Sequence, residues 1–357
     1  MNITDKIQVN RPEPISQDIE IISFNARMEA QKAIEDILDG NCILIEGFYS
    51  TGLSILHELS NFLKKKYPDQ SFQGQREFRS EYRKLSHKIL VNVSTNKLEL
   101  KKAPVIGWLE ILYPDFDKFM LPFPQIQGLN SAWQWYKKGI PIPVLRNKIH
   151  PYYGVYFPSR FEHLQLFDNW LKRYVGTKKT AMDIGIGSGV LSLQMMKHGF
   201  QKVYGTDTNP NAIIGLNQFM GGTKLSRKIE IDHGHLFAKW GQKTELIVFN
   251  PPWLPKSREL DRLDEAIYYN NKLFAEFFAE AKKRLLPNGK IVLLFSNLAQ
   301  ITKVKDSNPI EKEISEGGRF KKELYLTKKV KQASKKTKRN QNWRSMEVVE
   351  LWVLSHK

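Results

Sequence analysis

The chain has 357 residues, of which 41% are hydrophobic, and a formal net charge of +18 at pH 7. This length and apolar content are enough for one large or two ordinary domains and exclude a largely disordered chain. The charge excess attracts polyanions, so RNA or DNA is the expected kind of partner. A lysine-rich protein without such a partner is the alternative.

Cys42 is the only cysteine, which excludes an intramolecular disulfide and a zinc cluster built from cysteines. A lone cysteine fits a reducing compartment. Residues 1–13 are polar and no apolar run is long enough to span a bilayer, so we expect a cytoplasmic protein without a secretory signal or membrane segment. The histidines lack metal-ligand spacing, so no metal is expected. The sequence carries no signal for an oligomeric state.

The first part of the chain predicts a small α/β domain. Hydrophobic periodicity predicts helices over residues 26–39 and 50–66, with an apolar strand at 41–46 between them. Three β-like runs follow and predict a small antiparallel sheet. These runs are residues 88–94, 97–102 and 107–113.

Residues 114–150 are rich in proline and aromatic side chains. We expect them to form a connector that packs on the next domain, with the boundary near residue 145. The chain then divides into an N-terminal α/β accessory or substrate-recognition domain at residues 1–145 and a second domain at residues 146–357.

From Thr180 onward, strand-like and helical patterns alternate, which predicts a doubly wound, mainly parallel sheet. Residues 287–289 are expected to end the last helix, and residues 320–329 and 347–355 predict a closing antiparallel pair. The alternating strands are expected at residues 180–184, 202–206, 228–232, 245–249 and 290–296, and the helices at 189–198, 211–220 and 260–286.

A glycine-rich turn follows the first of these strands. The strand runs through Asp183, and Gly185, Gly187 and Gly189 lead into the next helix. Glycine permits a sharp turn and lets a ligand lie against the backbone. The G-x-G-x-G spacing differs from the dinucleotide-binding G-x-G-x-x-G, and a carboxylate at the strand end suits a cationic amino-acid moiety. The alternative is a tight turn that binds no ligand.

Asp207 ends the second strand, some two dozen residues after Asp183. An acidic residue at this position can accept hydrogen bonds from both hydroxyls of a ribose, with help from Asn209. The alternative is that Asp207 caps the helix that begins at Pro210. The glycine-rich turn upstream favours ribose binding.

The strand at residues 245–249 runs directly into Asn250, Pro251, Pro252 and Trp253. Two prolines exclude a helix and remove two backbone donors, while their carbonyl groups keep a fixed direction. The Asn250 side-chain carbonyl and the Pro251 backbone carbonyl can together accept both hydrogens of one NH2 group. Trp253 offers a flat face on which a base or an amide can stack. In isolation, a proline-bounded loop with a buried tryptophan is an equal alternative.

In this order the motifs resemble those of class I S-adenosylmethionine (SAM)-dependent methyltransferases, in the N-methylating branch with an Asn/Asp-Pro-Pro-aromatic signature. The resemblance covers roughly residues 150–357 and implies a Rossmann-like methyltransferase sheet. It implies that Asp207 binds the ribose of SAM and that residues 250–253 bind the target nitrogen. The methionine part of SAM would be held by Asp183, Gly185, Gly187 and Gly189.

Two further stretches bear on the resemblance. Residues 153–162 are loosely similar to the stretch of release-factor glutamine methyltransferases that covers SAM. Many family members have an acidic residue after the third strand that contacts the adenine amine, and His235 stands in that place here. We expect the adenine contact from the backbone, from His235 or from Asp232.

Two basic segments are candidates for contacts with phosphates. Their alternatives are a solvated hairpin tip and an exposed helix face. The first segment comprises Lys328, Lys329, Lys331, Lys335, Lys336, Lys338 and Arg339, followed by Trp343 and Arg344, and the second comprises Arg76, Arg79, Arg83 and Lys84.

The charge favours methylation of an exocyclic adenine or guanine amine in RNA. The main alternative is methylation of a glutamine side chain in a protein, because a carboxamide also presents an NH2 group. A DNA adenine methyltransferase and a non-catalytic SAM-binding protein are further alternatives. The expected partners are therefore RNA, a ribonucleoprotein or a protein substrate.

Overall fold

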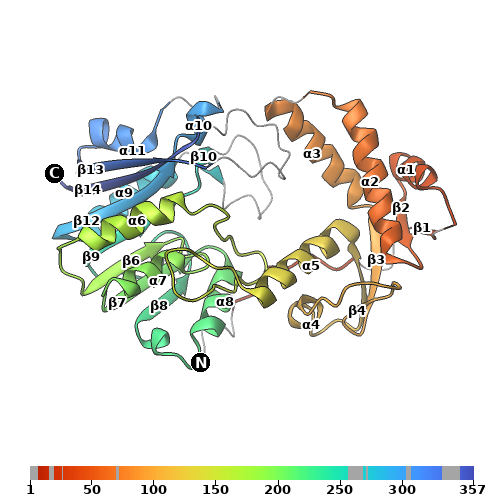
Figure 1. The fold of residues 1–357 in the computed structure, drawn as a ribbon, viewed down its shortest axis with the longest axis horizontal. Coiled ribbons are helices and arrows are strands. Elements are labelled where there is room, and N and C mark those ends of the chain that lie inside the picture. Colours follow the sequence, from red (N-terminus) through yellow and green to blue (C-terminus); the bar gives the residue numbers. More distant parts are fainter. Residues whose placement is uncertain are drawn as a thin grey trace. The chain divides into compact units, whose positions relative to one another are not determined.

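The computed structural model describes residues 7–15, 20–25, 27–69, 72–255, 268–270, 272–302, 307–331 and 346–357. The chain divides into two compact units (Figure 1). The N-terminal unit comprises Arg11–Lys138, and the C-terminal unit comprises Gly139–Lys357 together with Met1–Asn10. No helix among the described residues is both long and apolar enough to cross a membrane.

The N-terminal unit is built on a mixed sheet in the order β1-β2-β3-β4, with β5 also paired with β3. The antiparallel pairing expected between residues 88–94 and 97–102 is found between β3 and β4, and β5 also runs antiparallel to β3. The sheet is nevertheless mixed, because β1 and β2, which were not part of that expectation, are parallel to β3. Helices carry the chain back between the parallel strands, as parallel pairing requires. The strands are β1 Ile21–Phe24, β2 Cys42–Ile45, β3 Ile89–Ser94, β4 Lys97–Leu98 and β5 Lys118–Pro122.

Helices of this unit correct two expectations. Residues 107–113 form a helix and not a strand, since Trp108, Leu109 and Leu112 share a buried helical face. The stretch read as a connector contains β5 and α5, which belong to this unit and bury Met120 and Phe123. The helices are α1 Ala30–Leu38, α2 Tyr49–Lys66, α3 Phe72–Ser86, α4 Trp108–Leu112 and α5 Phe123–Lys138.

The main sheet of the C-terminal unit has the strand order β13-β14-β12-β9-β6-β7-β8. The five strands β12, β9, β6, β7 and β8 are parallel to one another. β14 runs antiparallel to both β12 and β13. This confirms the predicted doubly wound sheet with its closing antiparallel pair. The strands are β6 Thr180–Ile184, β7 Lys202–Asp207, β8 Ile229–His233, β9 Thr244–Phe249, β12 Leu285–Ser296, β13 Phe320–Lys329 and β14 Val348–His356.

One predicted helix of this unit is shorter than expected. The expected helix at residues 260–286 is α9, which begins only at Leu273, and Tyr268–Tyr269 forms β11, paired with β10. Residues 256–267 lie outside the described residues. The remaining elements are α6 Glu162–Arg173, α7 Val190–Lys197, α8 Pro210–Met220, η2 Lys224–Arg227, α9 Leu273–Arg284, α10 Leu298–Ile301, α11 Pro309–Lys312, η4 Glu313–Gly317 and β10 Leu254–Pro255.

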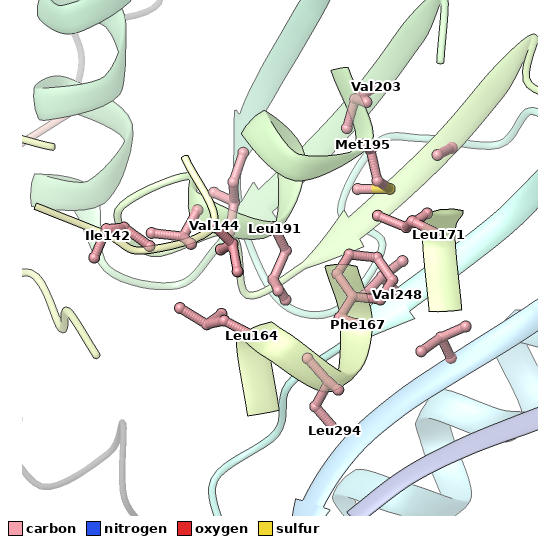
Figure 2. Packing of buried hydrophobic residues seen from close by; sticks show 14 of the residues in the cluster. Ile142, Val144, Leu164, Phe167, Leu171, Leu191, Met195, Val203, Val248 and Leu294 are labelled. Atoms are coloured by element: carbon pink, nitrogen blue, oxygen red, sulfur yellow. The ribbon is translucent and has the colours of Figure 1, made fainter. Parts of the chain in front are cut away.

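Both faces of this sheet are covered, which is why its strands are continuously apolar. Along β9, Leu246 and Val248 face the layer of α6, α7 and α8, whereas Ile247 and Phe249 face the layer of α9. Figure 2 shows the first layer, in which Leu164, Phe167 and Leu171 of α6 and Leu191 and Met195 of α7 gather with Val203, Val248 and Leu294 of the sheet.

Candidate functional site

The sequence motifs meet at the carboxyl edge of the sheet, where the strand order reverses. Ile184, the last residue of β6, pairs with Thr206 of β7 on one side and with Phe249 of β9 on the other. Neighbouring strands lie about 4.8 Å apart, and doubly wound sheets bind ligands at such a reversal. The next residues on the three strands are Gly185, Asp207 and Asn250.

The turn after β6 depends on its glycines. Gly185, Gly187 and Gly189 have φ angles of 68°, 51° and 77°, in the left-handed region that other residues rarely adopt. Gly189 is the N-cap of α7, where a Cβ atom would lie 2.8 Å from Cδ2 of Leu216. At Gly187 a Cβ atom would make an ordinary contact, 3.6 Å from the backbone oxygen of Tyr156, so there the positive φ alone favours glycine. The bare backbone of this turn is therefore a conformational requirement.

The carboxyl group of Asp183 is fully buried next to this turn. Its Oδ2 accepts a hydrogen bond of 2.6 Å from Ser192 Oγ, whereas its Oδ1 has no partner in the described part of the chain. Burial raises the pKa of Asp183 to about 7, and the negative charge of Asp207 adds to the rise. A buried carboxylate with an unpaired oxygen is suited to a cationic partner.

Asp207 holds the glycine-rich turn through backbone donors. Its Oδ2 accepts a hydrogen bond of 2.7 Å from the Gly187 N–H, and its Oδ1 accepts one of 2.8 Å from the Asn209 N–H. Burial raises the pKa of Asp207, although both donors act to lower it. Each carboxylate oxygen can accept more than one hydrogen bond, so ribose hydroxyls can be accommodated as well.

Asn209 is the N-cap of α8. The alternative expectation that Asp207 caps this helix is therefore wrong. Oδ1 of Asn209 accepts a hydrogen bond from Asn211 N at 3.1 Å, and its Nδ2 donates to the Gly154 carbonyl at 2.9 Å. Asn211 Nδ2 donates to the Tyr153 carbonyl at 2.8 Å. These two asparagines fasten the segment that the resemblance expects to cover SAM.

The Asn-Pro-Pro-Trp tetrad carries a contact that the sequence did not reveal. The indole Nε1 of Trp253 donates a hydrogen bond of 3.2 Å to Oδ1 of Asn250. An amide oxygen has two lone pairs, so one acceptor position of Asn250 remains. Pro251 is buried, and Trp253 is half-buried and packs against His163 of α6. His163 therefore lies beside the tetrad, a position that the sequence did not predict.

The comparisons with known proteins identify the kind of domain that carries this arrangement. The family model for the methyltransferase small domain matches residues 164–321. A Methanocaldococcus jannaschii protein named as a candidate protein N5-glutamine methyltransferase is 29% identical over 168 residues, which are 44% of this chain and 80% of that protein. This part of the chain is a SAM-dependent methyltransferase domain.

Other similar proteins match over shorter stretches or in fold alone. The ribosomal protein L11 methyltransferase of Alkaliphilus oremlandii is 32% identical over 80 residues, which are 22% of this chain and 26% of that protein. The solved ribosomal protein L11 methylase of Lactobacillus delbrueckii subsp. bulgaricus has a TM-score of 0.36 and 19% identity, and covers 55% of this chain and 79% of that one. The chain thus spans about a quarter of the length of the first of these two.

Within the methyltransferase domain, the two candidates for the adenine contact are engaged with neighbouring side chains. His235 is 55% exposed at its side chain, and its Nε2 lies 3.1 Å from Glu276 Oε2. Oδ1 of Asp232 lies 2.9 Å from Lys239 Nζ. The assignment of the adenine contact to either residue stays a prediction.

The first basic segment begins near α6. Lys328 Nζ donates to Gln165 Oε1 at 2.7 Å, and Lys331 N donates to Glu162 Oε1 at 3.1 Å. Since β13 is antiparallel to β14, it is parallel to the central strands and ends at the same carboxyl edge. The rest of this segment, Lys335, Lys336, Lys338, Arg339, Trp343 and Arg344, lies outside the described residues. The second basic segment is part of α3.

Proposed function

We propose that this enzyme transfers the methyl group of SAM to an exocyclic amine of an RNA base. The observation that carries the proposal is the adjacency of two motifs on paired strands. Ile184 of β6 and Phe249 of β9 are paired across the two strands. Gly185 begins the glycine-rich turn directly after Ile184, and Asn250 begins the tetrad directly after Phe249. An amine bound by the tetrad would therefore lie within reach of a cofactor held by the turn.

The cofactor side of the site fits SAM. Asp183, whose buried Oδ1 has no partner among the described residues, would face the cationic methionine part, and Asp207 would accept the ribose hydroxyls. The glycine-rich turn gives the cofactor access to backbone, because no side chain projects from Gly185, Gly187 or Gly189. When bound, SAM supplies a methyl group that its sulfonium has already activated.

The tetrad would position the nucleophile. The remaining acceptor position of Asn250 and the carbonyl of Pro251 would each accept one N–H of the amine. Such hydrogen bonds favour a pyramidal nitrogen and so localise a lone pair that is otherwise delocalised into the base. Trp253 would stack on the base and orient it, and orientation is the main demand of a transfer to nitrogen. The proton can leave after transfer, so the chain needs no strong base.

The charge supports RNA as the substrate, because a chain of +18 attracts polyanions. The N-terminal unit would then serve as an accessory domain, or as a substrate-recognition domain that acts by contacts other than phosphate binding. The lone Cys42 fits a reaction in the reducing cytoplasm. The second candidate is methylation of a protein glutamine, favoured by the name of the Methanocaldococcus jannaschii relative and by the NH2 group that a carboxamide shares with a base.

Labelled SAM distinguishes the two candidates. The protein is incubated with tritiated SAM and, separately, with RNA, DNA and protein fractions from cells. We expect label in RNA that ribonuclease releases and that digestion assigns to an N-methylated adenosine or guanosine. Label found only in protein, resistant to nuclease and recovered as methylglutamine, would replace the RNA proposal with the glutamine candidate.

A further inference from the structure

The positive charge of the chain lies almost entirely in the unit that contains the methyltransferase domain. Residues 11–138 hold 17 Lys and Arg against 16 Asp and Glu, a formal net charge of +1. The C-terminal unit therefore holds +17 of the total of +18. A polyanion is attracted chiefly to this unit and not to the accessory unit.

Six Lys and Arg residues of this unit lie at the amino edge of the parallel sheet, the edge opposite the proposed site. They directly precede the central strands β6, β8 and β9, and five of them are exposed while Lys178 is half-buried. We call this set the amino-edge cations: Lys178, Lys179, Lys224, Arg227, Lys228 and Lys243.

The sheet holds these cations side by side. The N–H of Lys202 donates to the carbonyl of Lys179 at 3.0 Å, and the N–H of Val203 donates to the carbonyl of Lys228 at 2.8 Å. Lys179 and Lys228 thus flank the start of β7 on its two sides. With strands about 4.8 Å apart, their side chains project from neighbouring positions of one edge.

The two carboxylates at this edge offset only part of the charge of the cluster. Glu230 pairs with Lys202 at 2.5 Å, and Oε2 of Glu245 accepts hydrogen bonds from the backbone N–H and the hydroxyl of Thr180. Within the ranges that the structure describes, none of the amino-edge cations forms an ion pair. Clustered like charges repel one another, and a polyanion relieves that repulsion when it binds.

We propose that the amino-edge cations bind phosphates of the RNA substrate and form a docking surface remote from the methyl-transfer site. This inference rests on the proposed function. The central strands that separate the two edges have five or six residues and span about 17–20 Å. Only an RNA long enough to pass around the domain can therefore occupy both surfaces at once.

The test combines charge removal with RNA length. The edge variant carries Lys178→Ala, Lys179→Ala, Lys228→Ala and Lys243→Ala, and the control variant carries Lys64→Ala, Lys65→Ala, Lys97→Ala and Lys118→Ala, which removes four exposed charges from the N-terminal unit. The probes are bulk transfer RNA and a single-stranded oligonucleotide of about five nucleotides that contains adenine and guanine. Binding is measured by fluorescence anisotropy across a salt series, and methyl transfer is followed with tritiated SAM.

We expect the edge variant to bind transfer RNA on the order of 10- to 100-fold more weakly at low salt, with a salt slope smaller by about 3. Its binding of the short oligonucleotide and its SAM affinity should match the wild type. The control variant should bind both RNAs nearly as the wild type does.

Equal affinity and salt slope of the edge variant and the control variant for transfer RNA would overturn the docking surface while wild-type label in RNA still supports the proposed function. An equal loss of affinity for long and short RNA in the edge variant would also overturn the docking surface, because such a loss reflects the net charge of the protein and not a binding site at this edge. Absence of both RNA binding and RNA labelling by the wild type would overturn the two proposals together.

Discussion

The imidazole of His163 meets the indole of Trp253 edge to face, with the ring centroids 5.6 Å apart and the planes at 90°. His163 is 3% exposed, and its Nδ1 has no hydrogen-bond partner among the described residues. Burial lowers the pKa of His163 to about 4, so the ring is neutral near neutral pH. Since Trp253 belongs to the proposed amine site, we expect His163 to act as a positioning residue that fixes the indole.

Two substitutions separate ring packing from the chemistry of the imidazole. His163→Phe keeps an aromatic edge against Trp253 and should retain methyl transfer near the wild-type level. His163→Ala leaves a cavity, and we expect it to lower kcat/KM about 10-fold and the free energy of unfolding by about 1–3 kcal/mol. SAM affinity, measured by calorimetry, should stay unchanged in both variants.

The same pair gives a pH test. The folded pKa of about 4 lies below the ordinary 6.5, so the unfolded chain binds more protons between these values. His163 therefore lowers stability as pH falls from 6.5 to 4, and His163→Phe should lack this part of the pH dependence of the unfolding free energy. If His163→Phe loses as much methyl transfer as His163→Ala, the imidazole nitrogen and not the ring packing carries the role.

Asn250→Ala tests the proposed hydrogen bond between the Asn250 side chain and the substrate amine. Removal of one positioned hydrogen bond should lower kcat by about 100-fold or more, while SAM affinity changes little. The substitution also removes the partner of the Trp253 indole N–H, so the thermal unfolding of the variant is measured alongside its turnover. Asn288→Ala, at an exposed position of the same domain, serves as the control. Wild-type turnover in Asn250→Ala would exclude Asn250 from the reaction.

Asp207→Ala tests the cofactor side. The variant loses the carboxylate that accepts from Gly187 N–H and the proposed bond to the ribose. We expect the Kd of SAM to rise at least about 10-fold, which corresponds to about 1.4 kcal/mol. Glu316→Ala removes the same charge from a side chain that is 68% exposed and should leave the Kd unchanged. Equal SAM affinity of Asp207→Ala and wild type would contradict the ribose assignment.

Local patterns were enough to predict the methyltransferase sheet. Each central strand is a short apolar run that ends at a polar or glycine-rich turn, as at Asp183 and Asn250, and parallel strands buried on both faces have this appearance. The pattern failed at residues 107–113, where Trp108, Leu109 and Leu112 are equally compatible with a buried strand and with one helical face. Only the packing in the unit makes that segment a helix.

The candidate site could be proposed from the sequence in part because its motifs are contiguous. The contacts of Ser192 with Asp183 and of His163 with Trp253 join residues of different elements. Neither residue belongs to a motif, so no local pattern could have indicated it. Asn209 shows the reverse case, because it directly precedes Pro210 and is the N-cap of α8, whereas the sequence made Asp207 the candidate for that cap. Tertiary contacts assign these roles, and sequence spacing does not.

Ionisation of the buried carboxyl of Asp183 should lower the stability of the folded protein, and bound SAM should offset this loss. The folded pKa of Asp183, about 7, lies above the ordinary 3.8, so the folded protein binds more protons than the unfolded chain between these values. Stability without SAM therefore falls as pH rises from about 4 to 7, by at most about 4 kcal/mol. Asp183→Asn has no such titration and should unfold at a higher temperature than wild type at pH 8, with little difference at pH 4.

Bound SAM should favour the wild type over Asp183→Asn at pH 8. The cationic methionine part would compensate the charge of Asp183 in the wild type but not the neutral amide of Asp183→Asn, so saturating SAM should raise the Tm of the wild type more at pH 8. Ser192→Ala is the matched control, because it removes the hydroxyl that donates to Oδ2 of Asp183 and should lower stability at pH 8. Should Asp183→Asn instead prove less stable than wild type at pH 8 without SAM, the carboxyl is held neutral or paired in the folded protein, and a cationic partner is not what the buried group requires.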